Sequence, residues 1–438
     1  MRVRISAGLR ALADNRAEKV GLTRFFRNRR VTAAEILRSA AERTGCAAAG
    51  RHVLLIEDTS EINYQPKAGR KRGLGRVGNG SDVGLFVHPA LAVDAADGVV
   101  LGLAGAAIWR RSRVKQDDYQ SLPIEEKESW KWLAAPLAAR PLLKQAACVT
   151  VIGDREADIY EVFARLPEAQ PFLRTHVLIR AVRDRALAEA GDRMLGKIAA
   201  EPEAGRLTFA LSGRPGRAAR QVTLAVRFCP VVLRQPRRGA DERDAPTIAL
   251  NLVEAREIDP PPSEEPIVWR LLTTHSVTSL AEAAEIVGFY RCRWIVEQLF
   301  RTVKSQGFDL EASFLSDGDA LECLAATTLV AAASVMQLVQ GRGEEGDALP
   351  AARLFTPAEI TVIETLIGKL EGKTAKQRNP HPAESLAWAA WCVARLGGWT
   401  GYAKERPPGP ITFVRGLRRF HAIAEGFYLA VPSKQERL

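Results

Sequence analysis

The chain has 438 residues, which is enough for two to four domains. Of these residues, 47% are hydrophobic and 26% are charged, proportions that are typical of a folded protein. Its 62 Lys and Arg exceed its 51 Asp and Glu by 11, which favours a polyanionic partner, nucleic acid before an anionic membrane. The absence of a CxxC pair, a signal peptide and an uncharged apolar stretch of 18 residues argues against a zinc site, secretion and membrane insertion, so we expect a cytoplasmic protein.

The N-terminal region, residues 1–50, is predicted to be helical and basic. Residues 1–52 hold 12 Lys or Arg against 4 Asp or Glu. In "GLTRFFRNRRVTAAEIL" (21–37), arginines alternate with Phe25 and Phe26. Such a stretch can hold phosphates while its aromatic rings enter a small helical core. A basic surface helix without a partner would show the same pattern.

Two apolar runs predict buried strands that lead into a carboxylate. "HVLLIE" (52–57) is followed by Asp58, and "CVTVIG" (148–153) is followed by Asp154. A predicted hairpin lies between these runs, and a predicted helix follows the second one. The order of strands and helices indicates an α/β layer with a mixed sheet.

Changes in the pattern divide the rest of the chain. Short alternating runs predict antiparallel strands, a Pro- and Glu-rich linker ends them, and the last part is Ala-rich and helical throughout. The predicted regions are residues 1–50, helical; 51–185, the first part of the α/β core; 186–265, a β-rich insertion; 266–312, the second part of the core; and 313–438, helical.

A long helix is predicted over residues 279–304, and its last turns carry an unusual polar face. At about 100° per residue, Tyr290, Arg293, Glu297 and Lys304 in "YRCRWIVEQLFRTVK" share a sector of roughly 60°. Apolar side chains occupy the opposite side of this helix, so one face is suited to a core and the other to a ligand. A solvated face with an ordinary Glu–Arg pair explains the same spacing.

Asp58, Asp154 and Glu297 are the candidate catalytic and metal-binding residues. Carboxylates at strand ends point into the crevice where α/β folds bind ligands. Three such groups need positive charge nearby, and a hard divalent cation such as Mg²⁺ supplies it. Two ions together can activate a nucleophile and stabilise a leaving oxygen in phosphodiester cleavage.

Structural explanations compete with this reading of the carboxylates. Asp154 is placed to cap the helix that follows it, and Asp58 to begin a turn. The neighbouring acids Glu57, Glu156 and Asp158 are expected to be solvated or in ion pairs rather than bound to metal.

The sequence resembles bacterial insertion-sequence transposases of the DDE class that have a ribonuclease-H-like catalytic core. "VLLIEDTSEINY", "VIGDREADIYEVF" and "YRCRWIVEQLFRTVK" occur in the family's order. Tyr290, Arg293, Glu297 and Lys304 match the Y-(2)-R-(3)-E-(6)-K signature of one subgroup. The family's core is interrupted by a β-rich insertion, as predicted here, and the resemblance covers nearly the whole chain.

The resemblance implies cut-and-paste DNA transposition, with endonuclease cleavage at transposon ends, a hairpin intermediate and strand transfer into target DNA. Asp58, Asp154 and Glu297 would hold two Mg²⁺ or Mn²⁺ ions. The partners implied are double-stranded DNA, both terminal inverted repeats and target, and a second copy of the chain in a synaptic homodimer within the bacterial nucleoid. Residues 1–50 would bind DNA, and residues 313–438 would form the dimer.

The implied DNA contacts come mainly from the polar face of the predicted helix. Tyr290, Arg293 and Lys304 would hold phosphates near the scissile position, with Arg293 suited to bidentate contact. Trp269 resembles the family's tryptophan that stacks on a flipped base, although a core position explains it as well. The other candidate contacts are Arg301 and, more weakly, Arg155 and Arg180.

One departure from the family leaves two other functions open. Only 57 residues precede Asp58, whereas the resemblance leads us to expect one or two more helices there. An alternative function is therefore an N-terminally shortened, non-catalytic protein that binds transposon ends or poisons the dimer. A structure-specific, metal-dependent nuclease on the same core is a third.

Overall fold

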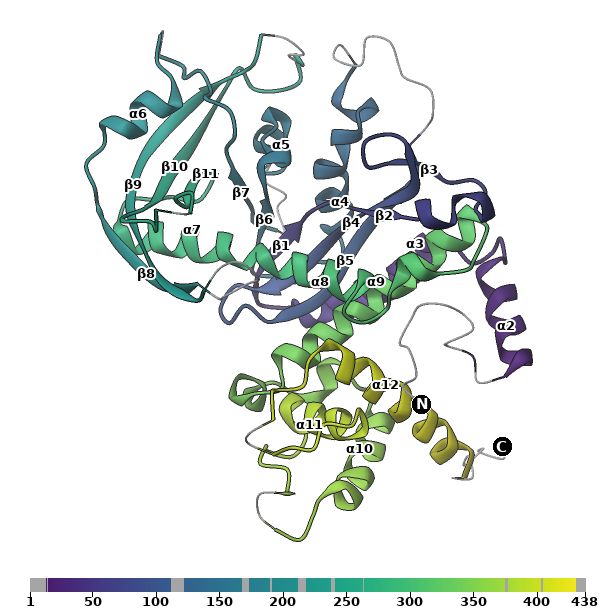
Figure 1. The fold of residues 1–438 in the computed structure, drawn as a ribbon. Helices are drawn as coiled ribbons and strands as arrows, with labels where there is room; N and C mark the ends of the chain where they lie inside the picture. Colours follow the sequence, from purple (N-terminus) through teal and green to yellow (C-terminus); the bar gives the residue numbers. More distant parts are fainter. Residues whose placement is uncertain are drawn as a thin grey trace, which may run out of the picture.

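The computed structural model describes residues 13, 15–111, 122–167, 173–189, 191–211, 218–237, 241–262, 264–374, 377–402 and 405–430. The strands in these residues form one 11-stranded sheet. Helices lie along the sheet, and α10, α11 and α12 gather below it in Figure 1.

Five strands form the core: the four that the sequence predicts, β1 (His52–Glu57), β4 (Asp82–Asp94), β5 (Val100–Trp109) and β6 (Cys148–Gly153), and in addition β7 (Thr175–Arg180). Their order across the sheet is β5, β4, β1, β6, β7. The first three strands are antiparallel neighbours, whereas β6 is parallel to both β1 and β7. This is a ribonuclease-H-like strand order, so the predicted mixed α/β core is confirmed.

The antiparallel strands predicted within residues 186–265 extend this same sheet. They are β8 (Gly205–Leu211), β9 (Arg220–Arg234) and β10 (Thr247–Glu257), and each is antiparallel to the next. Strand β11 (Val268–Thr273) pairs with β10 on one side and with β7 of the core on the other. The segment therefore continues the core sheet without a break in hydrogen bonding.

The core lies on both faces of the sheet. Leu54 and Ile56 of β1 belong to one apolar cluster, whereas Val53 and Leu55 belong to another, because successive side chains of a strand point to opposite faces. Helices α3, α8 and α9 cover the first face, and α4 and α5 contribute to the second. Their bounds are Ala33–Ala47 (α3), Lys131–Ala139 (α4), Tyr160–Arg165 (α5), Trp294–Lys304 (α8) and Gly318–Gln340 (α9).

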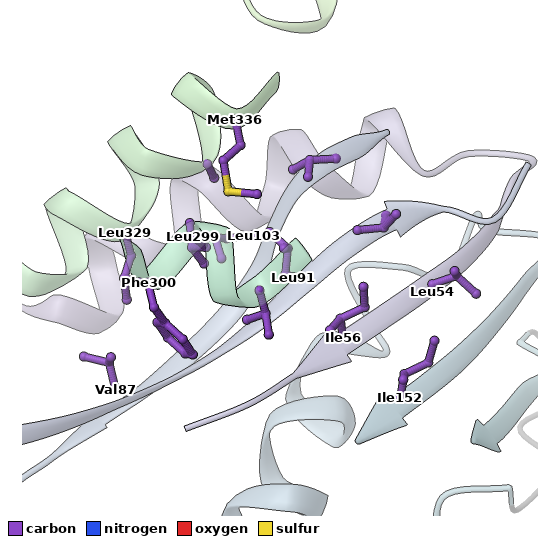
Figure 2. Packing of buried hydrophobic residues seen from close by; sticks show 14 of the residues in the cluster. Leu54, Ile56, Val87, Leu91, Leu103, Ile152, Leu299, Phe300, Leu329 and Met336 are labelled. Carbon is purple, nitrogen blue, oxygen red and sulfur yellow. The ribbon is translucent and has the colours of Figure 1, made fainter. Parts of the chain in front are cut away.

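Helix α8 is held on the sheet by its apolar side. Figure 2 shows Leu299 and Phe300 of α8 between the sheet and α9, close to Leu91 of β4. Leu299 is fully buried and Phe300 is 9% exposed. Burying side chains of this size stabilises a fold by about 1.5–3 kcal/mol each, which fixes the opposite, polar side of α8 relative to the strand ends.

The predicted long helix over residues 279–304 is broken. Helix α7 (Leu280–Cys292) ends before Arg293, and α8 begins after it. The N–H of Val296 donates to the carbonyl of Arg293, three residues back, so the α-helical pattern tightens at this point. Arg293 itself keeps helical dihedral angles (φ −52°, ψ −33°), and Tyr290, Arg293 and Glu297 meet at one site, as helical spacing predicts. A capping box at Ser279, with Glu282, starts α7.

The N-terminal and C-terminal parts of the described chain are helical, as predicted. Phe26 of α2 is buried and Phe25 is exposed, so one of the two predicted aromatic rings docks. Helix α9 has the length and hydropathy to cross a membrane, but 67% of its most apolar window is buried inside the protein, as in a core helix. The remaining bounds are Arg16–Phe26 (α2), Ser60–Asn63 (β2), Gly75–Val77 (β3), Met194–Ala200 (α6), Pro357–Leu370 (α10), Leu386–Leu396 (α11) and Pro410–Ala430 (α12).

Candidate active site

Two of the candidate carboxylates follow adjacent parallel strands. Strands β1 and β6 pair in register, from His52 with Cys148 to Ile56 with Ile152, so both end at the same edge of the sheet. Asp58 and Asp154 come next in the chain, and their side chains are 27% and 29% exposed. Two partly exposed carboxylates therefore lie together where a ligand could reach them.

The structure tests the alternative structural roles that the sequence allows for Asp154, Glu156 and Asp158. Asp154 precedes a short 3₁₀ turn and makes no side-chain capping hydrogen bond to it. Glu156 lies 3.7 Å from Lys131, and Asp158 makes a buried 2.5 Å ion pair with Arg185. The rivals Glu156 and Asp158 thus have the ion pairs that were expected, while Asp154 does not act as a helix cap.

One guanidinium connects all three candidate carboxylates. Arg293, at the break between α7 and α8, has Nη1 3.5 Å from Asp58 Oδ2. Its Nη2 lies 3.8 Å from Asp154 Oδ2 and 3.0 Å from Glu297 Oε1. The Arg293 side chain is only 6% exposed, so this contact is shielded from water on most sides. The helix break therefore places a cation at the centre of the cluster.

The electrostatics of the cluster are set by burial and by this cation. Burial raises the pKa of Asp58 to about 6, with smaller increases from Asp154 and Glu297, and the Thr59 amide and Arg293 oppose the shift. Burial lowers the pKa of Arg293, but Tyr290 and the carboxylates outweigh it and raise that pKa above its usual value. Arg293 therefore stays charged while Asp58 titrates near neutrality.

Tyr290 belongs to the same cluster. Its hydroxyl donates a hydrogen bond to Asp154 Oδ1 at 3.1 Å, and Arg180 Nη1 lies 3.8 Å from the same oxygen. Burial, with the Asp154 charge, raises the pKa of Tyr290 to about 12. The Tyr290 hydroxyl therefore keeps its proton at neutral pH and donates it to the hydrogen bond that helps to orient Asp154.

The donor set fits a hard divalent cation in its chemistry, because carboxylate oxygens are the ligands that Mg²⁺ and Mn²⁺ prefer. Across the described residues, no group of three or more His, Cys, Asp or Glu side chains is arranged to hold a metal ion. The Arg293 guanidinium stands among the three carboxylates, so it has to move aside before one cation can contact all of them.

The other predicted DNA contacts lie outside this cluster. Arg301 is 60% exposed and 4.0 Å from Glu297 Oε2, and Lys304 Nζ lies 3.8 Å from Glu311 Oε1. Trp269 is only 6% exposed, with its ring parallel to that of Phe209 at 6.1 Å and edge-on to that of Tyr290 at 5.5 Å. In this arrangement Trp269 is a core residue, and stacking on a base would require Phe209 to move.

Arg270 and Trp294 were not among the predicted residues. Arg270 lines a cavity of about 290 Å³ together with Arg155 and Arg180, the arginine that faces Asp154. Trp294 is 41% exposed, and its ring centroid lies 5.4 Å from the Arg293 guanidinium carbon. Arg270 directly follows the predicted residue Trp269, and Trp294 directly follows the predicted residue Arg293. Only the fold shows which residue of each pair is accessible.

Comparisons with known proteins find one family model and a solved structure that are similar to parts of this chain. Residues 130–333 match the family model described as "Transposase DDE domain". Among solved structures, the cryo-EM structure of a piggyBac transposase synaptic complex with hairpin DNA is similar, with a TM-score of 0.36 and 10% identity. That alignment covers 88% of this chain and 55% of the other, so the chain spans about half the length of that relative. The matched segment contains Asp154, Arg293 and Glu297 but not Asp58, so residues 130–333 are similar to transposase DDE domains.

Proposed function

We propose that the protein is a DNA transposase that cleaves transposon ends and transfers the freed strands into target DNA by a cut-and-paste route. The observation that carries this proposal is the convergence of Asp58, Asp154 and Glu297 on Arg293 at the strand ends, within and beside a matched transposase DDE domain. The reaction class is metal-dependent phosphodiester cleavage and transesterification.

The residues of the cluster have separate roles in this proposal. Asp58, Asp154 and Glu297 would hold Mg²⁺ or Mn²⁺, two ions per site, and these ions would supply an activated water and charge stabilisation at the leaving oxygen. Arg293 would exchange its carboxylate partners for a DNA phosphate, which it can bind through two N–H groups. Tyr290 would keep donating its hydrogen bond to Asp154 and so hold that carboxylate in position.

The remaining basic side chains would bind DNA on either side of the scissile phosphate. The cavity lined by Arg155, Arg180 and Arg270 would accept a phosphate group; Arg180 lies 3.8 Å from Asp154, and Arg270 also donates to the buried Glu254 at 2.8 Å. Arg301 and Lys304 extend the positive surface along α8. Phosphate contacts of this kind position the duplex and carry no sequence information.

A hairpin intermediate requires the terminal base to leave the stack and rest against an aromatic ring. Trp294 is the exposed tryptophan beside the cluster, whereas Trp269 is buried. We therefore assign the first aromatic contact to Trp294, and Trp269 becomes available only if Phe209 moves away from it. The proposed partners remain double-stranded DNA, with terminal inverted repeats and target, and a second copy of this chain in the bacterial cytoplasm.

Cleavage of DNA that carries the sequences flanking the gene tests the proposal. We expect nicking at the element boundary with Mg²⁺ or Mn²⁺, no nicking with EDTA, and a hairpin product on denaturing gels. Scrambled ends are the control for sequence dependence. Cleavage of branched DNA without regard to the ends would instead indicate a structure-specific nuclease.

The pH dependence of metal binding follows from Asp58. Its pKa is raised to about 6, so below pH 6 a proton occupies the carboxylate that the metal needs. We expect the apparent Mn²⁺ affinity, measured in the DNA complex, to be constant above about pH 7. It should fall by roughly tenfold per pH unit below pH 6. A constant affinity down to pH 5 would contradict the assignment of Asp58 as a ligand.

A second candidate function is an end-binding protein that regulates transposition without catalysis. The observation that favours it is that Arg293 contacts all three carboxylates, so the chain itself supplies positive charge to them. The same cleavage experiment separates the two functions. Specific binding of the ends without any nick, in both Mg²⁺ and Mn²⁺, would support the regulator.

A further inference from the structure

Asp58 has an unusual neighbour on the other face of the sheet. Glu57, the last residue of β1, is 1% exposed, and neither of its carboxylate oxygens has a hydrogen-bond partner among the described residues. Because adjacent side chains on a strand point to opposite faces, Glu57 enters the core while Asp58 faces the cluster around Arg293. A buried, unpaired carboxylate is costly, so its presence one residue from a candidate catalytic acid calls for an explanation.

His88 of β4 is the group that faces Glu57. The His88 Nε2 and Glu57 Oε1 atoms are 3.5 Å apart, and His88 is completely buried. The other ring nitrogen, Nδ1, lies 3.0 Å from the hydroxyl of Thr59. The Thr59 amide in turn donates to Asp58 Oδ1 at 2.7 Å. Close polar neighbours therefore lead from Glu57 through His88 to Thr59 and Asp58, and the contacts from His88 Nδ1 onward are hydrogen bonds.

The surroundings hold this path in one arrangement. The His88 ring packs edge-on against Trp132 of α4, with ring centroids 4.7 Å apart. Burial raises the pKa of Glu57 well above its usual value and lowers the pKa of His88 to about 3, with Lys131 adding to the His88 shift.

Stability alone does not account for these polar groups. A buried polar pair is often no more stabilising than apolar residues of similar volume, and it is costly when only partly satisfied. Leu54, Leu55 and Ile56, just before Glu57 on the same strand, are apolar and fully or almost fully buried, so β1 is compatible with an apolar residue at its end. What the polar path adds is a directed restraint on the Thr59 backbone and side chain.

We propose that Glu57, His88 and Thr59 are positioning residues for Asp58, fixing the orientation of its carboxylate for metal binding. The inference rests on the proposed function, because it assigns these residues to the metal site of that reaction. Groups that orient a metal ligand typically change metal affinity or activity by about 10–100-fold when they are removed. None of the three residues would touch the DNA or the metal.

Mn²⁺ binding to the full-length protein in complex with pre-cleaved end DNA tests the inference. The variants are Thr59→Val, which removes the hydroxyl, Glu57→Gln, which keeps a donor toward His88, and the double variant E57L/H88L, which removes the pair as a unit. Thr175→Val is the matched control, because the Thr175 hydroxyl is buried and has no hydrogen-bond partner among the described residues. Free Mn²⁺, DNA affinity and melting temperature are measured for each protein.

We expect Thr59→Val and E57L/H88L to need about 10–100-fold more Mn²⁺ for half-saturation, with DNA affinity within about twofold of the wild type. Glu57→Gln should stay close to the wild type, and the double variant should melt no lower than the Thr175→Val control. Wild-type Mn²⁺ affinity in both Thr59→Val and E57L/H88L would overturn the inference while leaving the proposed function intact. A wild-type protein that neither binds Mn²⁺ nor cleaves the ends would overturn both.

Discussion

Glu297→Gln is expected to reduce cleavage of transposon ends by at least about 10³-fold while leaving DNA binding intact. The substitution removes the only candidate carboxylate on α8, and losing one ligand of a catalytic metal site costs several kcal/mol of transition-state stabilisation. The neutral amide keeps the shape of the side chain and its place near Arg293, so the fold should not change. Single-turnover cleavage with Mn²⁺ and a binding titration in EDTA measure the two effects.

Glu156→Gln is the control for this experiment. Glu156 also follows β6, but it is 73% exposed on its side chain and lies near Lys131 instead of Arg293. Its loss should change cleavage by no more than about twofold, as is usual for exposed ion pairs. Equal losses in the two variants would mean that the cluster has no special role, and full activity in Glu297→Gln would reject the site.

Arg293→Gln is expected to destabilise the metal-free protein and to make divalent cations stabilising. In the structure this guanidinium is the cation nearest to Glu297, and its removal leaves three partly buried carboxylates facing one another. Removing a charged partner of this kind costs about 1–3 kcal/mol, so the melting temperature in EDTA should fall by several degrees. Mn²⁺ should then raise the melting temperature more in the variant than in the wild type, because the ion replaces the lost charge.

Arg301→Gln is the matched control for Arg293→Gln. Each arginine is four residues from Glu297, but Arg301 is 60% exposed and lies 4.0 Å away. Its loss should leave both the melting temperature and the response to Mn²⁺ unchanged within error. If Arg293→Gln behaved in the same way, the contacts of Arg293 with the carboxylates would contribute little, and its role would be limited to DNA.

Cleavage by Arg293→Gln should in addition fall by about 100-fold, because a phosphate contact is lost.

The positions of Asp58 and Asp154 could be predicted from the sequence because they depend on local patterns. Each of these residues follows a short, uninterrupted apolar run, which is the sequence pattern typical of a buried parallel strand. Parallel pairing of the two strands then brings their ends together. The same reasoning predicted the core strands and the antiparallel strands of residues 186–265.

The surroundings of the carboxylates could not be predicted in this way. Helical spacing predicts the shared face of Tyr290, Arg293 and Glu297, but it does not predict the tighter turn at Arg293 that divides the helix into α7 and α8. The burial of Trp269 depends on Phe209, which is 60 residues away in sequence and arrives through the pairing of β8 with β9. Contacts between distant segments leave no local pattern in a single sequence.

Strand β11 is shared by two parts of the chain. It is hydrogen-bonded to β7 of the five-stranded core on one side and to β10 on the other. A core trimmed of residues 186–265 would therefore present β11 as a bare edge, and unpaired edges recruit strands from other molecules. The segment thus moves the free edge of the sheet away from the core, from β11 to β8, and a minimal catalytic fragment has to retain at least one strand beside β11 to keep that edge paired.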